Sequence, residues 1–159
     1  MTKIAMKKFT DLVAESAENV TEIFPWDLEE KLDNDSKPLL LDVREPYEFE
    51  AMHITDSINV PRGILETACE YDYEETVPEL VEARNKEVIV ICRSGNRSIF
   101  AAEVMQKMGY TNVVSLKTGL RGWSDYEQPM FDKDGNEISE DDAIEYFTTH
   151  LRADQMSPK

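Results

Sequence analysis

The chain has 159 residues, 41% apolar and 31% charged, which suits one domain with a real core and a short extension at an end. Its 33 acidic residues outnumber 17 basic ones, and the net charge of −16 disfavours nucleic acid and anionic membranes as partners. Two cysteines are too few for a disulfide framework, and no apolar run approaches the length of a membrane span. Acidic residues from Asp11 onward interrupt any signal-like stretch, so we expect a cytoplasmic protein with reduced thiols.

The first predicted element is an amphipathic helix over residues 4–20, within an N-terminal extension of residues 1–21. Its apolar residues recur at roughly helical spacing: Ile4, Phe9, Leu12, Val13 and Val20. Packing on its own domain is the simpler role for this helix, and binding a partner or a second copy is the alternative. A short helix capped by Asp27 should follow.

Short apolar runs then alternate with helical patterns. The predicted strands cover residues 39–41, 57–60, 88–91 and 112–116, and the predicted helices cover 77–84, 98–108 and 119–126. Continuous runs rich in β-branched residues suit strands that are buried on both faces, as in a parallel sheet covered by helices. The alternation therefore predicts an α/β fold with a central parallel sheet flanked by helices.

Residues 130–159 predict a turn followed by an extra C-terminal helix. Ser139 and Asp142 have the spacing of a capping box, and the apolar face would consist of Ala143, Ile144, Phe147 and Leu151. The Asp-rich turn at 132–136 invites a calcium-loop interpretation. That interpretation fails because Met130 would occupy the first ligand position, so we predict an ordinary turn and no metal site.

The segment best suited to chemistry is the loop Cys92-Arg93-Ser94-Gly95-Asn96-Arg97-Ser98, which follows the strand at 88–91. Ligands of open α/β sheets bind at the carboxyl ends of strands. Gly95 permits a curl that points successive backbone N–H groups inward, and the following helix adds the positive end of its dipole. With the charges of Arg93 and Arg97, these groups favour the thiolate of Cys92 and would bind an anionic substrate.

A simpler interpretation is that Cys92 only packs in the core, as most isolated cysteines do. An inert core cysteine does not need two arginines, a glycine and a helix start within six residues, so we predict a reactive Cys92. Cys69 lies in an acidic stretch, and acidic neighbours raise the pKa of a thiol. A structural or incidental role for Cys69 is favoured over a redox partnership with Cys92.

Three blocks in residues 22–129 resemble single-domain rhodaneses, which are sulfurtransferases of the thiosulfate type. The blocks are Leu41-Asp42-Val43-Arg44-Glu45-Pro46-Tyr47-Glu48-Phe49 with His53-Ile54 and Ile58-Asn59-Val60-Pro61, then the cysteine loop with Ala101-Ala102, and last Gly109-Tyr110, Asn112-Val113 and Gly119-Leu120-Arg121-Gly122-Trp123. Three positions depart from the family pattern, because Met52, Asp56 and Thr118 stand where glycine is usual. These departures concern turns rather than the cysteine loop.

The resemblance implies that Cys92 takes a sulfane sulfur from an anionic donor such as thiosulfate, holds it as a persulfide, and passes it to a thiol or to cyanide. Residues 93–97, comprising Arg93, Ser94, Gly95, Asn96 and Arg97, would bind the substrate. Arg93 and Arg97 would orient the anionic donor, with fixing of the loop as a further role for Arg97. Asp42, Arg44 and Ser98 would support the site, and His53 is expected to be structural. Neither a metal nor an organic cofactor is required.

Two rival functions remain open at this point. One is a persulfide-carrying or regulatory binding module that acts with a dedicated partner, such as a sulfur-carrier protein. The other is a cysteine-based phosphatase or arsenate reductase. Those enzymes place five residues between cysteine and arginine, whereas four residues separate Cys92 from Arg97, so this ring suits a sulfur atom better than a tetrahedral anion.

Overall fold

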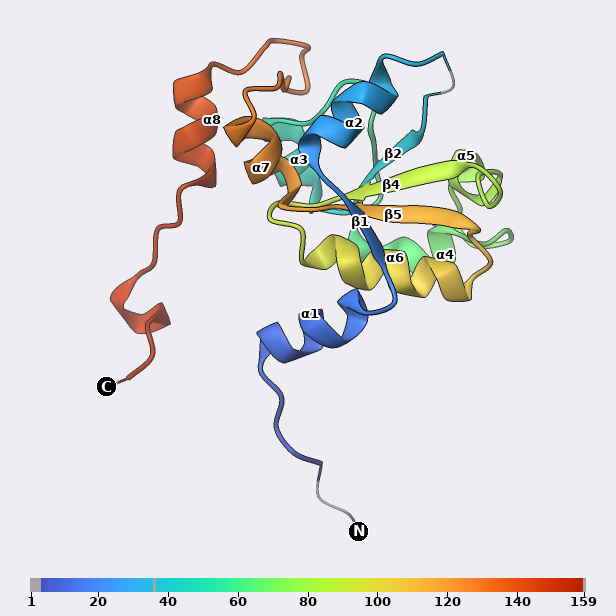
Figure 1. The fold of residues 1–159 in the computed structure, drawn as a ribbon, viewed down its shortest axis with the longest axis horizontal. Coiled ribbons are helices and arrows are strands. Elements are labelled where there is room, and N and C mark those ends of the chain that lie inside the picture. Colours follow the sequence, from blue (N-terminus) through green and yellow to red (C-terminus); the bar gives the residue numbers. More distant parts are fainter. Residues whose placement is uncertain (1–3, 36, 159) are drawn as a thin grey trace.

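A computed structural model describes residues 4–35 and 37–158, so the first three residues of the predicted N-terminal extension lie outside it. Five strands form one parallel sheet in the order β1-β5-β4-β2-β3 (Figure 1). The strands are β1 (Thr21–Ile23), β2 (Leu39–Asp42), β3 (Ile58–Asn59), β4 (Glu87–Ile91) and β5 (Asn112–Leu116). The predicted α/β fold with a central parallel sheet is confirmed.

Helices cover both faces of this sheet. They are α1 (Phe9–Ala17), α2 (Pro25–Leu32), α3 (Pro46–Ala51), α4 (Leu65–Ala68), α5 (Pro78–Val81), α6 (Arg97–Lys107), α7 (Gly119–Asp125) and α8 (Glu140–Phe147), with short 3₁₀ turns η1 (Arg62–Ile64) and η2 (Ala153–Gln155). Side chains alternate across each strand, so Val88, Val90 and Cys92 face one apolar cluster while Ile89 and Ile91 face the other. Figure 1 shows α4 and α6 on one side of the sheet and α2, α7 and α8 on the other.

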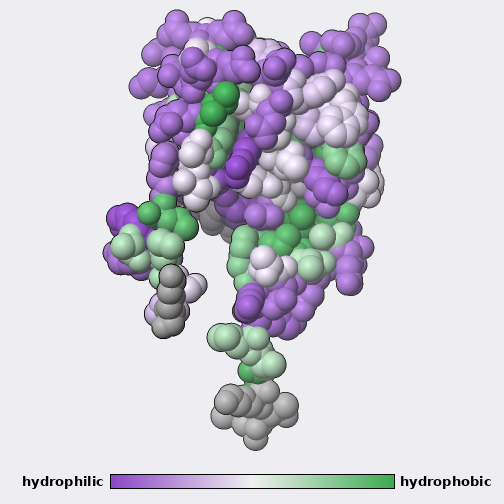
Figure 2. Space-filling model, turned by 60° about the vertical axis from the view of Figure 1, so that its left-hand side comes forward, coloured by the Kyte–Doolittle hydropathy of each residue, from purple (hydrophilic) through white to green (hydrophobic). Residues whose placement is uncertain are grey.

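The N-terminal helix is shorter than predicted. Residues 4–8 are not helical, and Ile4 and Met6 are 88% and 91% exposed. The Asp11 carboxylate accepts a hydrogen bond from the Lys8 backbone N–H at 2.9 Å, which caps the helix and fixes its start at Phe9. Figure 2 shows apolar surface in the lower part of the molecule, toward the N-terminus.

Helix α1 packs on its own domain, which was the simpler of the two predicted roles. The Phe9 ring lies 6.2 Å from the Phe100 ring of α6, measured between centroids. Ser16 and Asn19 both donate hydrogen bonds to the Glu103 carboxylate, at 3.1 Å each. The extension therefore covers one side of α6.

Sequence analysis missed strand β1 and extended the C-terminal helix too far. Thr21-Glu22-Ile23 is short and polar, because an edge strand that pairs only with β5 needs no continuous apolar run. Helix α8 starts at the predicted cap, where Ser139 Oγ accepts from the Asp142 N–H at 3.1 Å, but it ends at Phe147. Leu151 lies beyond the helix and is 61% exposed, so it does not share the face of Ala143 and Phe147.

The turn at 132–136 is closed by its own hydrogen bonds. Asp132 Oδ1 accepts from the N–H groups of Asp134 and Asn136 at 2.9 Å each, as an ordinary Asx turn does. Among residues 4–35 and 37–158, no helix is long and apolar enough to cross a bilayer.

Candidate active site

Cys92 lies directly after β4, at the carboxyl edge of the sheet, and is 1% exposed. The backbone N–H of Gly95 donates to Cys92 Sγ at 3.1 Å, so the loop curls back over the sulfur. Gly95 has a φ of +89°, and a Cβ atom there would lie 2.8 Å from the Thr118 nitrogen. Only glycine fits this position, because any side chain would be strained in conformation and would collide with the neighbouring loop.

Two buried hydroxyl groups lie behind the sulfur. Cys92 Sγ is 3.2 Å from Ser98 Oγ, to which the thiol donates, and Ser98 Oγ lies 2.7 Å from Ser115 Oγ. Both serines are fully buried. Ser98 thus lies where sequence analysis expected a supporting residue, whereas Ser115 was missed, although it is a polar residue inside an apolar strand.

The carbonyl groups of the loop are held by the start of α7. Leu120 N–H donates to Cys92 O, and Arg121 N–H donates to Arg93 O, at 2.9 Å each. Gly119 has a φ of +57°, and a Cβ atom there would lie 2.5 Å from Cys92 O. The backbone of α7 therefore packs directly against the cysteine loop.

The amide groups of the loop are available to a ligand. The N–H groups of Ser94, Asn96 and Arg97 donate to no acceptor among residues 4–35 and 37–158. Gly95 N–H already points at the sulfur. Successive amides of this kind form an anion-binding concavity, which suits the negative charge of a thiolate or of a group carried on it.

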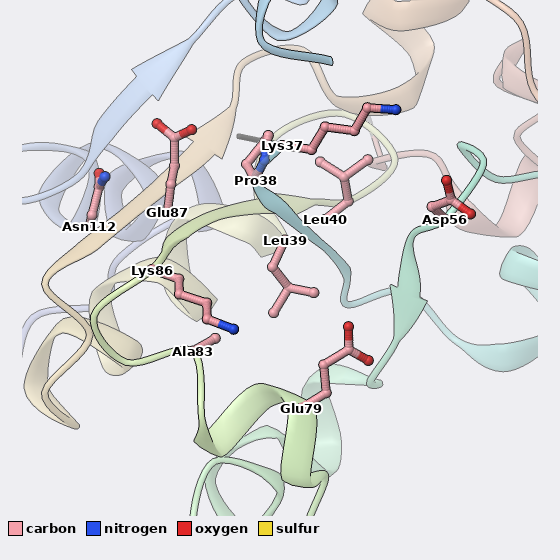
Figure 3. A pocket seen from close by; sticks show the side chains of 10 residues that line it. All are labelled: Lys37, Pro38, Leu39, Leu40, Asp56, Glu79, Ala83, Lys86, Glu87 and Asn112. Carbon is pink, nitrogen blue, oxygen red and sulfur yellow. The ribbon is translucent and has the colours of Figure 1, made fainter. Parts of the chain in front are cut away.

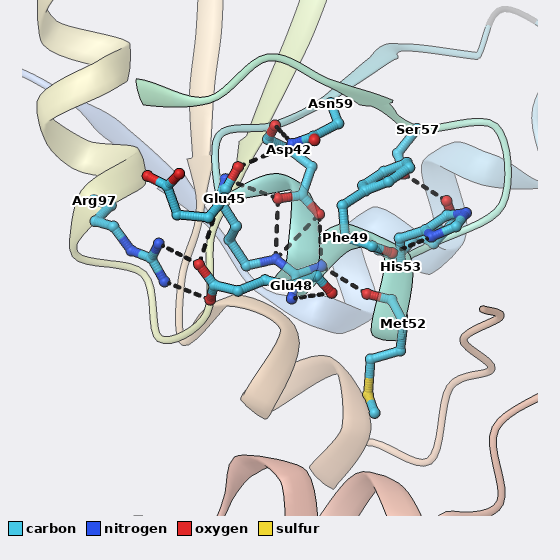
Figure 4. A network of polar contacts seen from close by, with 11 residues as sticks. Asp42, Glu45, Glu48, Phe49, Met52, His53, Ser57, Asn59 and Arg97 are labelled. Carbon is cyan, nitrogen blue, oxygen red and sulfur yellow. Dashed lines mark hydrogen bonds and ion pairs between the residues drawn. The ribbon is translucent and has the colours of Figure 1, made fainter. Parts of the chain in front are cut away.

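The two loop arginines differ in their partners. Arg97 forms a two-point ion pair with Glu48 of α3, with N–O distances of 2.8 and 3.0 Å (Figure 4). Burial alone would raise the pKa of Glu48, but hydrogen bonds from Arg97 and from the Glu45 N–H outweigh it, so this pKa lies below its ordinary value. Arg97, predicted to orient the donor and to fix the loop, is thus paired with a carboxylate that was not predicted.

Arg93 has neutral partners instead. Its Nη2 donates to the carbonyl oxygen of Phe147 at 3.1 Å, and its guanidinium lies 5.9 Å from the centre of the Phe147 ring. Phe147 is the last residue of α8, and sequence analysis did not connect that helix with the loop. Arg93 therefore keeps a positive charge that no carboxylate among the described residues compensates.

Asp42 and Arg44 form a buried ion pair beside this site. Arg44 Nη2 lies 2.8 Å from Asp42 Oδ2 and 2.7 Å from Met52 O, and Arg44 is fully buried. Arg44 Nη1 also donates to Glu48 O at 3.3 Å, so the pair joins the end of β2 to α3. Figure 4 shows this network reaching Arg97 through Glu48. Arg44 donates to backbone carbonyl groups of α3 and of the residue after it, while the Asp42 carboxylate accepts from Arg44.

His53 is held away from the sulfur. Its Nδ1 lies 2.7 Å from Phe49 O, and its ring stacks on the Phe49 ring at 3.8 Å between centroids.

Of the three positions where the family usually has glycine, Asp56 and Thr118 have φ values of +67° and +66°. The glycine conformation is therefore retained at both positions without glycine, at a cost of about 1–2 kcal/mol each. Met52 is different, because its φ of −168° is ordinary extended backbone.

Cys69 is also buried, at 0% exposure, at the end of α4. Burial raises the pKa of its thiol. The direction agrees with the sequence-based prediction, but the main cause is loss of water, and the acidic neighbour Glu66 adds less. Within the described ranges no cluster of His, Cys, Asp or Glu has the arrangement of a metal site.

A cavity of about 600 Å³ lies elsewhere, at the amino ends of β2, β4 and β5 (Figure 3). It carries Lys37, Lys86, Glu79 and Glu87 among its lining residues, and it includes none of the predicted site residues. The cysteine loop lies at the opposite edge of the sheet, the edge where parallel α/β sheets bind their ligands.

The geometry agrees with comparisons to known proteins. The model of the Rhodanese-like domain matches residues 25–126. "Putative sulfur carrier protein YrkF" of Bacillus subtilis is 34% identical over 119 residues, covering 75% of this chain and 59% of that protein. "Putative thiosulfate sulfurtransferase, mitochondrial" of Schizosaccharomyces pombe is 35% identical over 103 residues, covering 63% and 72%. The chain thus spans about three fifths of the Bacillus protein's length.

Among solved structures, the protein RPA3614 of Rhodopseudomonas palustris, described as of unknown function and a "Possible Tyrosine Phosphatase", superposes with a TM-score of 0.69 at 25% identity. The alignment covers 82% of this chain and 98% of that one. The matched family model covers well over half of the chain and includes the whole cysteine loop. The chain belongs to the rhodanese-like domain family.

Proposed function

We propose that this protein is a sulfurtransferase that carries a sulfane sulfur on Cys92 between an anionic donor and a thiol acceptor. The observation that carries the proposal is the Gly95 N–H pointing at Cys92 Sγ at 3.1 Å, within a loop whose neighbouring amides have no acceptor among the described residues. Such a ring of amides stabilises negative charge on a sulfur atom without moving during the reaction.

With thiosulfate as the donor, the Cys92 thiolate attacks the outer sulfur atom. A bond forms between the two sulfur atoms, the sulfur–sulfur bond of thiosulfate breaks, and sulfite leaves with the bonding electron pair. The product is a Cys92 persulfide, whose terminal sulfur carries the negative charge. A thiolate or cyanide then attacks that terminal sulfur, and the Cys92 thiolate is restored.

Each loop residue has a distinct part in this proposal. The amides of Ser94, Gly95 and Asn96 receive the persulfide charge. Arg93 attracts the anionic donor, because its charge is uncompensated, while Arg97 fixes the loop to α3 through Glu48. Ser98 supports the sulfur through its hydroxyl group, 3.2 Å from Cys92 Sγ, and Asp42 with Arg44 holds α3 in place.

Mass spectrometry of the intact protein tests the proposal. The protein is incubated separately with thiosulfate, mercaptopyruvate and glutathione persulfide, and we expect a mass gain of one sulfur atom on the peptide that contains Cys92. Release of sulfite should match the thiosulfate reaction mole for mole. Absence of the adduct with all three donors would overturn the proposal.

A second candidate is a persulfide carrier that delivers sulfur to one protein partner and turns over thiosulfate poorly. The name of the Bacillus relative as a sulfur carrier favours it. In that case the adduct forms, but cyanide removes it slowly.

The name of the Rhodopseudomonas structure suggests a phosphatase instead. Hydrolysis of para-nitrophenyl phosphate that depends on Cys92 would favour that function over both.

A further inference from the structure

Helix α8 lies outside residues 25–126, yet it is docked on the domain at the edge where the strands end (Figure 1). Ala143 and Phe147 are 5% and 3% exposed and belong to the same apolar cluster as Trp123 of α7. Ile144, between them on the helix, is 52% exposed. The docked face of α8 therefore rests on two buried residues that stand one turn apart.

The end of this helix contacts the residue that follows the proposed nucleophile. Phe147 O accepts from Arg93 Nη2 at 3.1 Å, and the Phe147 ring faces the same guanidinium. The last carbonyl groups of a helix lack intrahelical donors and carry partial negative charge, which favours a cation there. A cation over an aromatic face is attracted as well. Arg93 is thus held by two groups of α8.

These contacts do not pair the positive charge of Arg93 with a carboxylate. Both of its partners are neutral, whereas the charge of Arg97 is compensated by Glu48. The acidic first turn of α8, with Glu140 and Asp141, begins at the opposite end of the helix. At 1.5 Å per residue that turn lies about 9 Å along the axis from Phe147. The helix therefore turns its carbonyl end toward the loop and the carboxylates of its first turn away, while Glu145 of the last turn lies 3.2 Å from His150 Nε2.

Tyr146 supports the position of Phe147 at this end of α8. The Tyr146 ring packs edge-on against Phe147 at 5.2 Å between centroids. Burial raises the pKa of Tyr146, the charges of Arg44 and Arg93 lower it, and the charge of Glu48 raises it. The C-terminal end of α8 thus places Phe147 on Arg93 and Tyr146 on Phe147.

We propose that α8 is part of the active site, with Phe147 as a positioning residue that holds Arg93 beside Cys92 to attract an anionic sulfur donor. The identity of the donor rests on the proposed function, but the positioning of a charge does not. α8 is then a determinant of donor affinity that the matched domain does not itself contain.

Paired alkylating reagents measure this charge directly in the 159-residue chain. Iodoacetate is anionic and iodoacetamide is neutral, so the rate of alkylation of Cys92 by iodoacetate divided by the rate by iodoacetamide reports the local positive charge. This quotient is called the ratio below. Site-resolved mass spectrometry separates Cys92 from Cys69. We expect Arg93→Gln to lower the ratio by about threefold to tenfold, the size of one partly screened charge.

Two substitutions in α8 test the positioning. Ala143→Asp buries a carboxylate at the docked face and releases α8, and its matched control, Ile144→Asp, adds the same charge at the neighbouring exposed position. Phe147→Leu removes the ring but keeps an apolar side chain. We expect Ala143→Asp to lower the ratio nearly as far as Arg93→Gln, Phe147→Leu to lower it by about twofold, and Ile144→Asp to change it least.

A double mutant completes the test. In the Arg93→Gln background, Ala143→Asp should lower the ratio no further than Ile144→Asp does, because the charge that α8 positions is gone. An unchanged ratio in both Ala143→Asp and Phe147→Leu would overturn the inference. A raised ratio would overturn it too, since α8 would then mask Arg93. A protein that gains no sulfur but shows the expected ratios would refute the proposed function alone.

Discussion

Cys92 and Cys69 are buried to the same degree, at 1% and 0% exposure, and face the same apolar cluster. They differ in what surrounds the sulfur atom. Cys92 receives an N–H from Gly95 and lies beside a buried hydroxyl, while two arginines stand in its loop. Cys69 follows a short helix; Tyr110 and Arg84 lower the pKa of its thiol, but burial raises it by more. Exposure therefore does not distinguish the proposed nucleophile from the other cysteine, whereas a backbone N–H directed at the sulfur does.

The largest expected effect comes from exchanging each cysteine for serine. Cys92→Ser should abolish sulfur transfer, at least about a thousandfold, because the hydroxyl is a far poorer nucleophile toward sulfur. Cys69→Ser should retain transfer within about threefold, since no step uses that thiol. Sulfite release from thiosulfate measures both. Loss of transfer in Cys69→Ser with an intact fold would end the distinction between the two cysteines.

Gly119→Ala should act on Cys92 and leave Cys69 unaffected. The added Cβ would lie 2.5 Å from Cys92 O, and the position has a positive φ, so the loop must shift. We expect at least about a tenfold loss of sulfur transfer. Gly63→Ala is the matched control, because nothing lies within 4 Å of its Cβ and its φ is not positive. Equal losses in both variants would show that the α7 contact does not shape the site.

Glu48→Gln should loosen the loop around Cys92. We expect a loss of about 1–2 kcal/mol of stability at pH 7, because Arg97 loses its charged partner. Because the folded pKa of Glu48 is lowered, its contribution is present above the unfolded pKa and disappears as pH falls through the folded pKa. The stability difference between wild type and variant should therefore shrink from about pH 6 to about pH 3 in urea unfolding. A difference that grows on acidification would contradict the pairing.

The smallest effect concerns salt. Raising the ionic strength from about 0.05 M to about 0.5 M should slow the thiosulfate reaction by about twofold to threefold, because it screens the attraction of Arg93 for a dianion. Iodoacetamide is neutral, so its rate at Cys92 should not change. A thiosulfate rate that is constant or rises with salt would mean that the net charge of −16 dominates at the loop.

The elements that the sequence predicted best are those with strong local patterns. Strands β2 and β4 contain continuous apolar runs, β5 contains one interrupted by Ser115, and Ser139 with Asp142 marks the start of α8. Helix α3 was missed as a helix because its six residues are too few for a periodic signal. The cysteine loop was located because glycine, cysteine and two arginines fall within six positions.

The contacts that determine the charge at the cysteine loop join residues far apart in the sequence, so short-range sequence patterns do not predict them. Arg97 pairs with Glu48, which stands 49 positions earlier, and Arg93 meets Phe147, which stands 54 positions later. Sequence alone predicts that both arginines orient the donor, with fixing of the loop as a further role of Arg97, and it does not indicate which carboxylate lies near either arginine. Only the packing of α3 and α8 at the strand ends separates their roles.

The hydrogen bonds from Leu120 and Arg121 to the carbonyl groups of Cys92 and Arg93 have a consequence for when the entropy cost of ordering the cysteine loop is met. With these oxygen atoms tied to α7, the peptide groups of the loop cannot rotate without breaking two bonds, so the dipoles around the sulfur keep their direction. The conformational entropy of arranging them is lost once, when the chain folds. In the proposed sulfur transfer, little reorganisation energy is then needed for each turnover, and the atom that moves is the sulfur itself.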